Sequence, residues 1–256
     1  TNRKLDGVQN IIAVSSGKGG VGKSTVTANL AISLSEMGFN VGILDADIYG
    51  PSIPVMFDVF DSKPLAVNID GKSKMKPVES FGIKILSIGF FTKLDQAVIW
   101  RGPMASKALN QMIFDAAWGE LDFLLIDLPP GTGDIHLSIM QSLPISGAVV
   151  VSTPQNVALV DARKGVSMFN QENINVPVLG IIENMSYFTP LELPNNKYYL
   201  FGKEGAKNLS TDLGVPFLGE IPLIQSIRES GDCGRPAALQ DETEIQSVFN
   251  DISKNM

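Results

Sequence analysis

The sequence predicts an α/β fold in which a mostly parallel central sheet carries helices on both faces. Three observations predict this class. Apolar runs with little alternation recur along the chain, as expected for strands buried on both faces, and a segment able to form a helix follows most of them. A glycine-rich turn at residues 16–25 joins the first run to the first helix. The 256 residues suffice for one large domain with a well-buried core, so we expect a single domain over residues 1–256.

The glycine-rich turn indicates a nucleotide site. It lies between a strand at residues 10–14 and a helix expected over residues 23–37, and it matches the pattern G-x-x-x-x-G-K-[ST]. Glycines let main-chain N–H groups wrap a polyphosphate, and the helix N-terminus adds its positive dipole end. Lys23 supplies charge to the β- and γ-phosphates, and the Ser24 hydroxyl is a ligand for Mg²⁺. The nucleotide-binding residues predicted from this turn are Gly17, Lys18, Gly19, Gly20, Val21, Gly22, Lys23, Ser24 and Thr25.

Aspartates close two of the buried strands. The strand at residues 40–47 ends in Asp45 and Asp47, and the strand at residues 123–127 ends in Asp127. Two carboxylates beside a triphosphate would repel it unless Mg²⁺ or water lies between them, so we expect metal or water handling at the first strand. The alternative for Asp47 is a helix N-cap or turn aspartate. Asp127 fits the Walker B group that holds Mg²⁺. The predicted Mg²⁺ ligands are Ser24, Asp47 and Asp127.

The stretch from about residue 51 to residue 102 is expected to be an irregular insertion, because prolines interrupt it. A short strand at residues 82–88 is expected inside it, between the two halves of the sheet. A loop at residues 94–104 then enters a helix over residues 106–118. Trp100 and Arg101 in this loop are interpreted as a packed aromatic and a surface arginine rather than as a contact to a partner.

A switch segment is expected directly after Asp127. Glycine N–H groups at residues 129–133 can bond to a γ-phosphate and release it after hydrolysis. His136 is the only histidine, and we interpret it as a structural or helix-start residue rather than a catalytic one.

The rest of the chain repeats the strand-then-helix pattern. Strands are expected at residues 148–154, 176–185 and 215–222, and helices at residues 156–172, 205–213 and 242–254. The amide of Asn184 can donate to and accept from the edge of adenine, and Pro222 at the end of the next strand is placed to pack on the base. The last helix is acidic and unlike a basic membrane tail.

Composition excludes several classes of protein. A hydrophobic content of 44% with 18% charged residues is typical of a globular protein. The net charge of −7 argues against a surface for DNA or anionic lipid, and no apolar stretch approaches the roughly 20 residues that span a bilayer. Cys233 is the only cysteine, which favours a cytoplasmic location without disulfides. The chain begins at Thr1 and enters its first strand almost at once, as an excised domain would.

The motifs resemble the Mrp/ApbC family of P-loop ATPases, the nucleotide-binding iron–sulfur cluster carriers. K-G-G-x-G-K-[ST] at residues 18–24 is similar to the deviant phosphate loop of the wider MinD/ParA/Mrp class. More specific matches are D-A-D-I-Y-G-P-S at residues 45–52, D-L-P-P-G-T-G-D at residues 127–134, T-P-Q at residues 153–155, D-A-R-K-G at residues 161–165 and E-N-M-S at residues 183–186.

The resemblance implies a function and roles for particular residues. It implies ATP binding with slow hydrolysis, a homodimer, and delivery of iron–sulfur clusters to apoproteins, with iron–sulfur assembly factors or client apoproteins as partners. In this class the early lysine, here Lys18, reaches the nucleotide of the partner subunit, and the second aspartate, here Asp47, activates the attacking water. The catalytic residues are therefore expected to be Lys18, Lys23 and Asp47.

One departure from the family pattern concerns the cluster. The family's usual C-x-x-C follows the E-N-M-S segment, but residues 187–194 contain no cysteine. Cys233 would supply only two thiolates per dimer where a cluster needs four, so we interpret it as incidental rather than as an iron–sulfur ligand. Two alternatives stay open. One is a ParA/MinD-like positioning module, although the acidic charge predicts no binding to DNA or membrane, and the other is an adaptor ATPase without a cluster.

Overall fold

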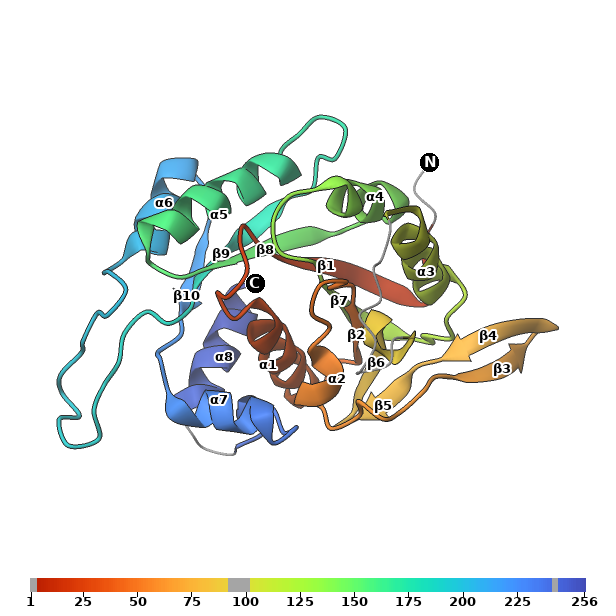
Figure 1. The fold of residues 1–256 in the computed structure, drawn as a ribbon, viewed down its shortest axis with the longest axis horizontal. Coiled ribbons are helices and arrows are strands. Elements are labelled where there is room, and N and C mark those ends of the chain that lie inside the picture. The colour runs from red at the N-terminus through yellow and green to blue at the C-terminus, as the bar shows by residue number, and fades with distance from the viewer. Residues whose placement is uncertain (1–3, 92–101, 241–243) are drawn as a thin grey trace.

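The computed structural model describes residues 4–91, 102–240 and 244–256, and its centre is an eight-stranded sheet (Figure 1). The strand order is β10-β9-β8-β1-β7-β2-β6-β5, and every neighbouring pair is parallel except β5 and β6. The strands of this sheet are β1 (Val8–Ser16), β2 (Val41–Asp45), β5 (Val78–Ser80), β6 (Ile83–Ser87), β7 (Leu121–Asp127), β8 (Gly147–Ser152), β9 (Val178–Glu183) and β10 (Phe217–Glu220). The mostly parallel sheet predicted from the sequence is confirmed.

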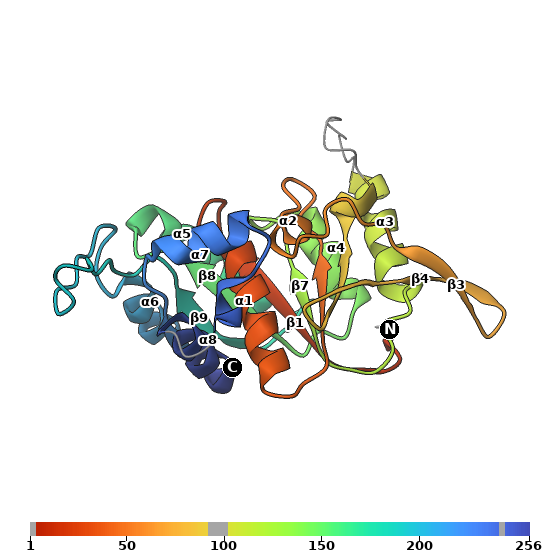
Figure 2. The ribbon, with the colours of Figure 1, turned by 90° about the horizontal axis from the view of Figure 1, so that it is seen from below.

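Helices cover both faces of the sheet (Figures 1 and 2). They are α1 (Lys23–Glu36), α2 (Ile53–Met56), α3 (Gly102–Phe114), α4 (Asp134–Ser142), α5 (Asn156–Phe169), α6 (Gly205–Leu213), α7 (Gln225–Asp232) and α8 (Glu244–Asn255). Side chains of α3, α4, α5 and α6 join one buried cluster, and those of α1, α2, α7 and α8 join the other or pack against it.

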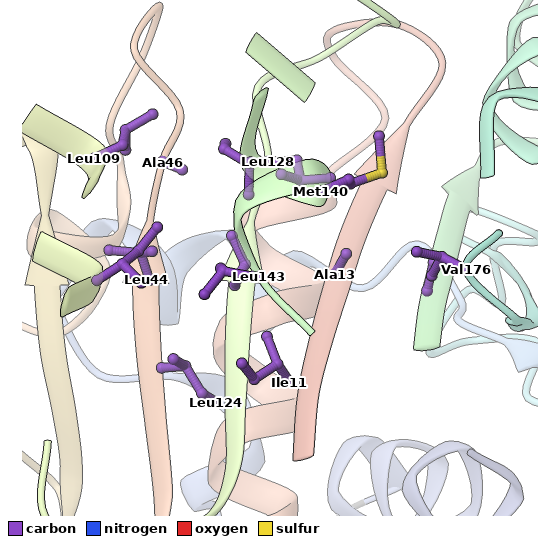
Figure 3. Close-up of a cluster of buried hydrophobic side chains, with 14 of the residues drawn as sticks. Ile11, Ala13, Leu44, Ala46, Leu109, Leu124, Leu128, Met140, Leu143 and Val176 are labelled. Atoms are coloured by element: carbon purple, nitrogen blue, oxygen red, sulfur yellow. The ribbon is translucent and has the colours of Figure 1, made fainter. Parts of the chain in front are cut away.

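The strand sequence explains the two clusters. Successive side chains of a strand point to opposite faces, and along β1 Ile11 and Ala13 enter the first cluster while Ile12 and Val14 enter the second. Figure 3 shows the first cluster, where Leu109 and Met140 from the helices lie over the strand residues. Because both faces are apolar, the central strands read as continuous apolar runs.

The stretch predicted to be irregular contains regular structure. Besides α2, β5 and β6, it forms a 3-10 turn (Ile88–Phe91) and a separate hairpin of β3 (Leu65–Ile69) and β4 (Lys72–Lys76), which extends from the body of the protein (Figure 1). β6 lies outside β2 near the sheet edge, so its expected place between the two halves of the sheet was wrong. Trp100 and Arg101 lie outside the described residues.

The helix predicted over residues 106–118 is shifted toward the N-terminus. It begins at Gly102, with Pro103 in the first turn, where proline fits because the N–H groups of that turn have no helical partner. It ends at Phe114 because the following chain pairs with β4: Met75 N donates to Asp115 O, and Ala117 N donates to Met75 O, each at 2.8 Å. Trp118 is therefore outside the helix and buried in the core.

The remaining predicted boundaries differ by a few residues. The helix predicted over residues 156–172 ends at Phe169, and the last helix runs over Glu244–Asn255. Among the helices that the structure describes, none is both long enough and apolar enough to cross a membrane.

Candidate nucleotide-binding site

The site lies at the carboxyl ends of three adjacent central strands. β7 lies between β1 and β2, so the residues that follow each strand meet at one edge of the sheet. Asp127 pairs in register with Val14 of β1 and with Asp45 of β2. Open α/β sheets bind ligands at this edge. The glycine-rich turn, the D-x-D pair and the Walker B aspartate, which are far apart in the sequence, are therefore brought together.

The glycine-rich turn lines a cleft. Ser16 and residues 19–25 form one wall, and Asp47, Ser52, Met56 and Pro130 complete the lining. Ser52 and Met56 were not predicted from the sequence. They reach the cleft because the turn after β2 leads into the short helix α2; Ser52 ends the D-A-D-I-Y-G-P-S motif, whereas Met56 lies beyond it.

Two glycines of the turn are required by close approaches. A Cβ at Gly17 would overlap the main chain of Asp161 and Ala162 in α5, so the loop and that helix touch backbone to backbone. Gly22 has φ of +81°, and a Cβ there would overlap the Asn184 amide nitrogen. Only glycine combines the left-handed backbone with this contact.

Lys23 is buried among carboxylates. Its Nζ lies 2.7 Å from Asp127 Oδ1 and 3.5 Å from Asp47 Oδ2, and its side chain is 5% exposed. Burial by itself lowers the pKa of Lys23, but the charges of Asp127, Asp47 and Asp45 outweigh it, and the net pKa is raised. Lys23 is therefore a fixed positive charge at the base of the cleft.

Asp127 receives three hydrogen bonds from α1. Lys23 Nζ and Thr27 Oγ1 donate to Oδ1 at 2.7 and 3.0 Å, and Ser24 Oγ donates to Oδ2 at 2.6 Å. Thr27 was not predicted. Its position four residues after Lys23 places it on the same face of α1, and that spacing is the signal that identifies it. The site therefore holds Asp127 and Ser24 in direct contact.

The two aspartates after β2 have different surroundings. Asp47 Oδ1 accepts from the N–H groups of Tyr49 and Gly50 at 3.1 and 3.2 Å, as a turn aspartate does, while its Oδ2 faces Lys23. The turn interpretation of Asp47 therefore describes Oδ1, and the metal or water role of this side chain stays a prediction. Burial raises the pKa of Asp47, Lys23 lowers it and Asp127 raises it further, with a net increase.

Asp45 is fully buried and bonded to three donors. These are the Ser87 hydroxyl at 2.9 Å and the main-chain N–H groups of Asp47 and Ile53 at 3.2 and 3.3 Å. Burial and then the charge of Asp127 raise the pKa of Asp45 to about 8. Asp45 therefore ties the end of β2 to β6 and to the turn that carries Asp47.

The predicted switch segment, residues 129–133, contacts both the loop and α4. Gly131 N donates to Ser16 O at 2.9 Å. His136 is buried in the first turn of α4, where its ring bonds to Pro129 O at 2.7 Å and accepts from Gly133 N at 2.9 Å. Burial lowers the pKa of His136. The expected helix-start position of His136 is confirmed.

The remaining predicted residues lie in different surroundings. Asn184 is buried and its Nδ2 donates to Val21 O at 2.9 Å, so it supports the phosphate loop directly. Pro222 is buried after β10 and does not line the cleft. Within the described residues, Lys18 Nζ has no ion-pair partner. Cys233 is exposed at the C-terminus of α7, and no group of three potential metal ligands surrounds it in the described part of the chain.

The segment after E-N-M-S is a loop that contains several aromatic and apolar residues. Phe188 and Tyr198 form an antiparallel bridge, and Lys197 Nζ lies 3.9 Å from the centre of the Tyr187 ring. Leu191 is 94% exposed. At the position where the family resemblance implies a C-x-x-C, this chain therefore has a folded loop without thiols.

Comparison with known sequence families decides the classification. Residues 7–256 match the family described as ParA: NUBPL iron-transfer P-loop NTPase. The chain belongs to this family. Its resemblance to nucleotide-binding iron–sulfur carriers, inferred from the motifs, is thereby confirmed.

Similarity to individual proteins agrees with this family assignment. The iron-sulfur cluster carrier protein of Aquifex aeolicus is 49% identical over 256 residues, covering 99% of this chain and 69% of that protein. A nucleotide-binding protein of Archaeoglobus fulgidus in complex with ADP is 39% identical, with a TM-score of 0.81 over 96% of this chain and 94% of the other. The septum site-determining protein MinD of Pyrococcus horikoshii, complexed with Mg-ADP, is 25% identical, with a TM-score of 0.69 over 96% and 95%.

Proposed function

We propose that this P-loop NTPase is a homodimeric Mg-ATPase that takes part in the transfer of iron–sulfur clusters to apoproteins, in the cytoplasm, with residues 1–256 acting as one ATPase domain. The observation that carries the ATPase part is the contact of Asp127 with Lys23 and Ser24 beneath the glycine-rich loop. The cluster part is supported by relatives such as the iron-sulfur cluster carrier protein of Aquifex aeolicus.

The phosphates bind along the loop. Residues 19–25, which include the N-terminus of α1, line the cleft and offer their main-chain N–H groups to the phosphates, and Lys23 contributes its fixed charge. Asn184, already bonded to Val21 O, has one N–H and its carbonyl oxygen left for the edge of adenine. Pro222 does not line the cleft, so the expected packing of Pro222 on the base is not part of this proposal.

The donor set beneath the loop fits Mg²⁺. Ser24 Oγ and Asp127 Oδ2 are hard oxygen donors 2.6 Å apart, and Asp47 Oδ2 lies 3.5 Å from Lys23 Nζ, which also contacts Asp127. Mg²⁺ is commonly held by one or two carboxylates together with substrate phosphates, which agrees with the lack of a complete protein-only metal cluster among the described residues. When bound, the ion neutralises charge on the phosphates.

Hydrolysis requires a placed water and a stabilised leaving group. The water oxygen forms a bond to the γ-phosphorus while the bond to the bridging oxygen of the β-phosphate breaks, and the proton passes to the released phosphate. Asp47 Oδ2 orients the water, with Oδ1 fixed by the N–H groups of Tyr49 and Gly50. Lys23 stabilises charge on the β- and γ-phosphates.

Lys18 supports the proposed dimer. Its ammonium group makes no ion pair within the described chain, as expected for a cation that reaches the nucleotide of a second copy. Sedimentation analysis should show dimers with Mg-ATP, and Lys18→Ala should remain monomeric and lose most ATPase activity. A wild-type protein that stays monomeric with Mg-ATP and is no more active than Lys18→Ala would contradict the proposed dimer.

Because this chain lacks the family's usual cysteine pair, a cluster must obtain its ligands from other groups. A dimer of this chain contains two copies of Cys233, fewer than the four thiolates of common clusters. We therefore propose that the client or an assembly factor supplies thiolates during transfer. The second candidate function, an ATPase adaptor that holds no cluster, is favoured by the same shortage of thiols.

Anaerobic reconstitution with iron and sulfide distinguishes these functions. The transfer function predicts iron and sulfide above background on the protein mixed with a thiol-bearing apoprotein, and faster loading of the apoprotein when Mg-ATP is present. Cys233→Ser should behave as wild type. If Mg-ATP does not accelerate loading of the apoprotein, the transfer function is contradicted and the adaptor function is favoured. Co-sedimentation with DNA or anionic vesicles in ATP would instead indicate a positioning module.

A further inference from the structure

One buried histidine holds both ends of the switch segment. The His136 ring bonds to Pro129 O at 2.7 Å and to Gly133 N at 2.9 Å, so its two nitrogens span the five residues 129–133. The side chain is 3% exposed. It lies on α4, whose buried side chains are part of the first core cluster.

The partners of the ring define its protonation. A carbonyl oxygen can only accept a hydrogen bond and a main-chain N–H can only donate one. His136 must therefore carry its proton on Nε2, facing Pro129, and present a bare Nδ1 to Gly133. Burial, which lowers the pKa of His136, favours this neutral form.

The residues between these two bonds include one that lines the nucleotide cleft and one that bonds to the phosphate loop. Pro130 lines the cleft, and Gly131 N donates to Ser16 O at the start of the phosphate loop. Gly131 has φ of +88°, a left-handed conformation that glycine adopts without the steric penalty of a Cβ. Because both ends of the segment are fixed by one ring, the position of Pro130 and Gly131 depends on that ring.

We propose that His136 is a positioning residue for ATP hydrolysis, which holds residues 129–133 against the γ-phosphate end of the cleft. This role rests on the proposed ATPase function. The ring contacts no residue of the phosphate loop in the hydrogen bonds of the structure, so it acts on turnover through the switch segment and leaves nucleotide binding to the loop.

The test separates turnover from binding. His136→Ala is compared with wild type and with Gln141→Ala, an exposed change on the same helix, by measuring kcat for ATP and Kd for ADP. We expect His136→Ala to lower kcat at least tenfold with the Kd within twofold, and Gln141→Ala to change neither. A kcat within twofold of wild type, or a Kd that rises as much as kcat falls, overturns the role.

Two further measurements cover other outcomes. If His136→Ala does not fold, His136→Gln retains an amide donor for Pro129 and should give a kcat between the wild-type value and a tenfold loss; full activity overturns the role. Because the chain has one histidine, ¹⁵N NMR of the wild-type imidazole reports this site alone. A proton on Nδ1 would overturn the hydrogen bonding that the positioning role requires, and this result does not depend on ATPase activity. A wild-type protein that hydrolyses no ATP would instead count against the proposed ATPase function.

Discussion

Replacing Gly22 by alanine tests the contact between the phosphate loop and Asn184. Two costs are expected. A non-glycine residue in the left-handed region, here φ of +81°, costs about 1–2 kcal/mol. The new Cβ also displaces the Asn184 amide from Val21 O, and a buried polar group left without its partner costs about 1–3 kcal/mol. The sum is a loss of about 2–5 kcal/mol in the free energy of unfolding.

Gly20→Ala is the matched control. Gly20 has the same φ of +81°, but a Cβ there meets nothing within 4 Å, so only the backbone cost of about 1–2 kcal/mol applies. Urea unfolding of both variants isolates the Asn184 contribution as their difference. In the double variant Gly22→Ala with Asn184→Ala, the overlap is removed and the two losses should be less than additive. The reasoning is refuted if Gly22→Ala is no more destabilising than Gly20→Ala.

Three other predictions concern carboxylates of the site. Asp47→Ala should keep the Kd for ADP within a few fold and lower kcat about 10²–10⁴-fold, in steady-state assays with titrated nucleotide; unchanged turnover would remove Asp47 as the water-orienting group. Thr27→Val removes a buried hydrogen bond to Asp127 and should cost about 1.5–3 kcal/mol in urea unfolding; a neutral effect would contradict that bond. Because the folded pKa of Asp45, about 8, exceeds the unfolded value of 3.8, its contribution to stability is complete below pH 3.8 and falls as pH rises to about 8. The unfolding free energy of wild type minus that of Asp45→Asn should therefore decrease over this window, by at most about 1.4 kcal/mol per pH unit, and a rising or flat difference would contradict it.

Much of the site follows from local sequence. The loop from Gly17 to Thr25 can be predicted from its glycines, its flanking strand and helix, and its Lys-Ser pair, because all these features are close together in the sequence. Asp127 was predictable for a similar reason, since an aspartate that ends a buried strand must lie at the binding edge of a parallel sheet.

Contacts between distant residues could not be predicted. The end of α3 is set by main-chain pairing with Met75, and that pairing overrides the helical character of residues 115–118. The partners of Asp45, Ser87 and Ile53, come from β6 and α2, whose positions depend on the whole sheet. The β3–β4 hairpin, by contrast, has a local signal: Asp70 and Gly71 have φ of +50° and +77° and form the tight turn between the two strands.

The exposed single thiol at the end of α7 makes this chain suited to site-specific labelling. A maleimide dye reacts with cysteine, and Cys233 is both accessible and the only cysteine in the sequence. Two copies labelled with a donor and an acceptor would carry the dyes at equivalent positions in a dimer. Energy transfer between them would then follow association and separation of the copies in real time as ATP is consumed.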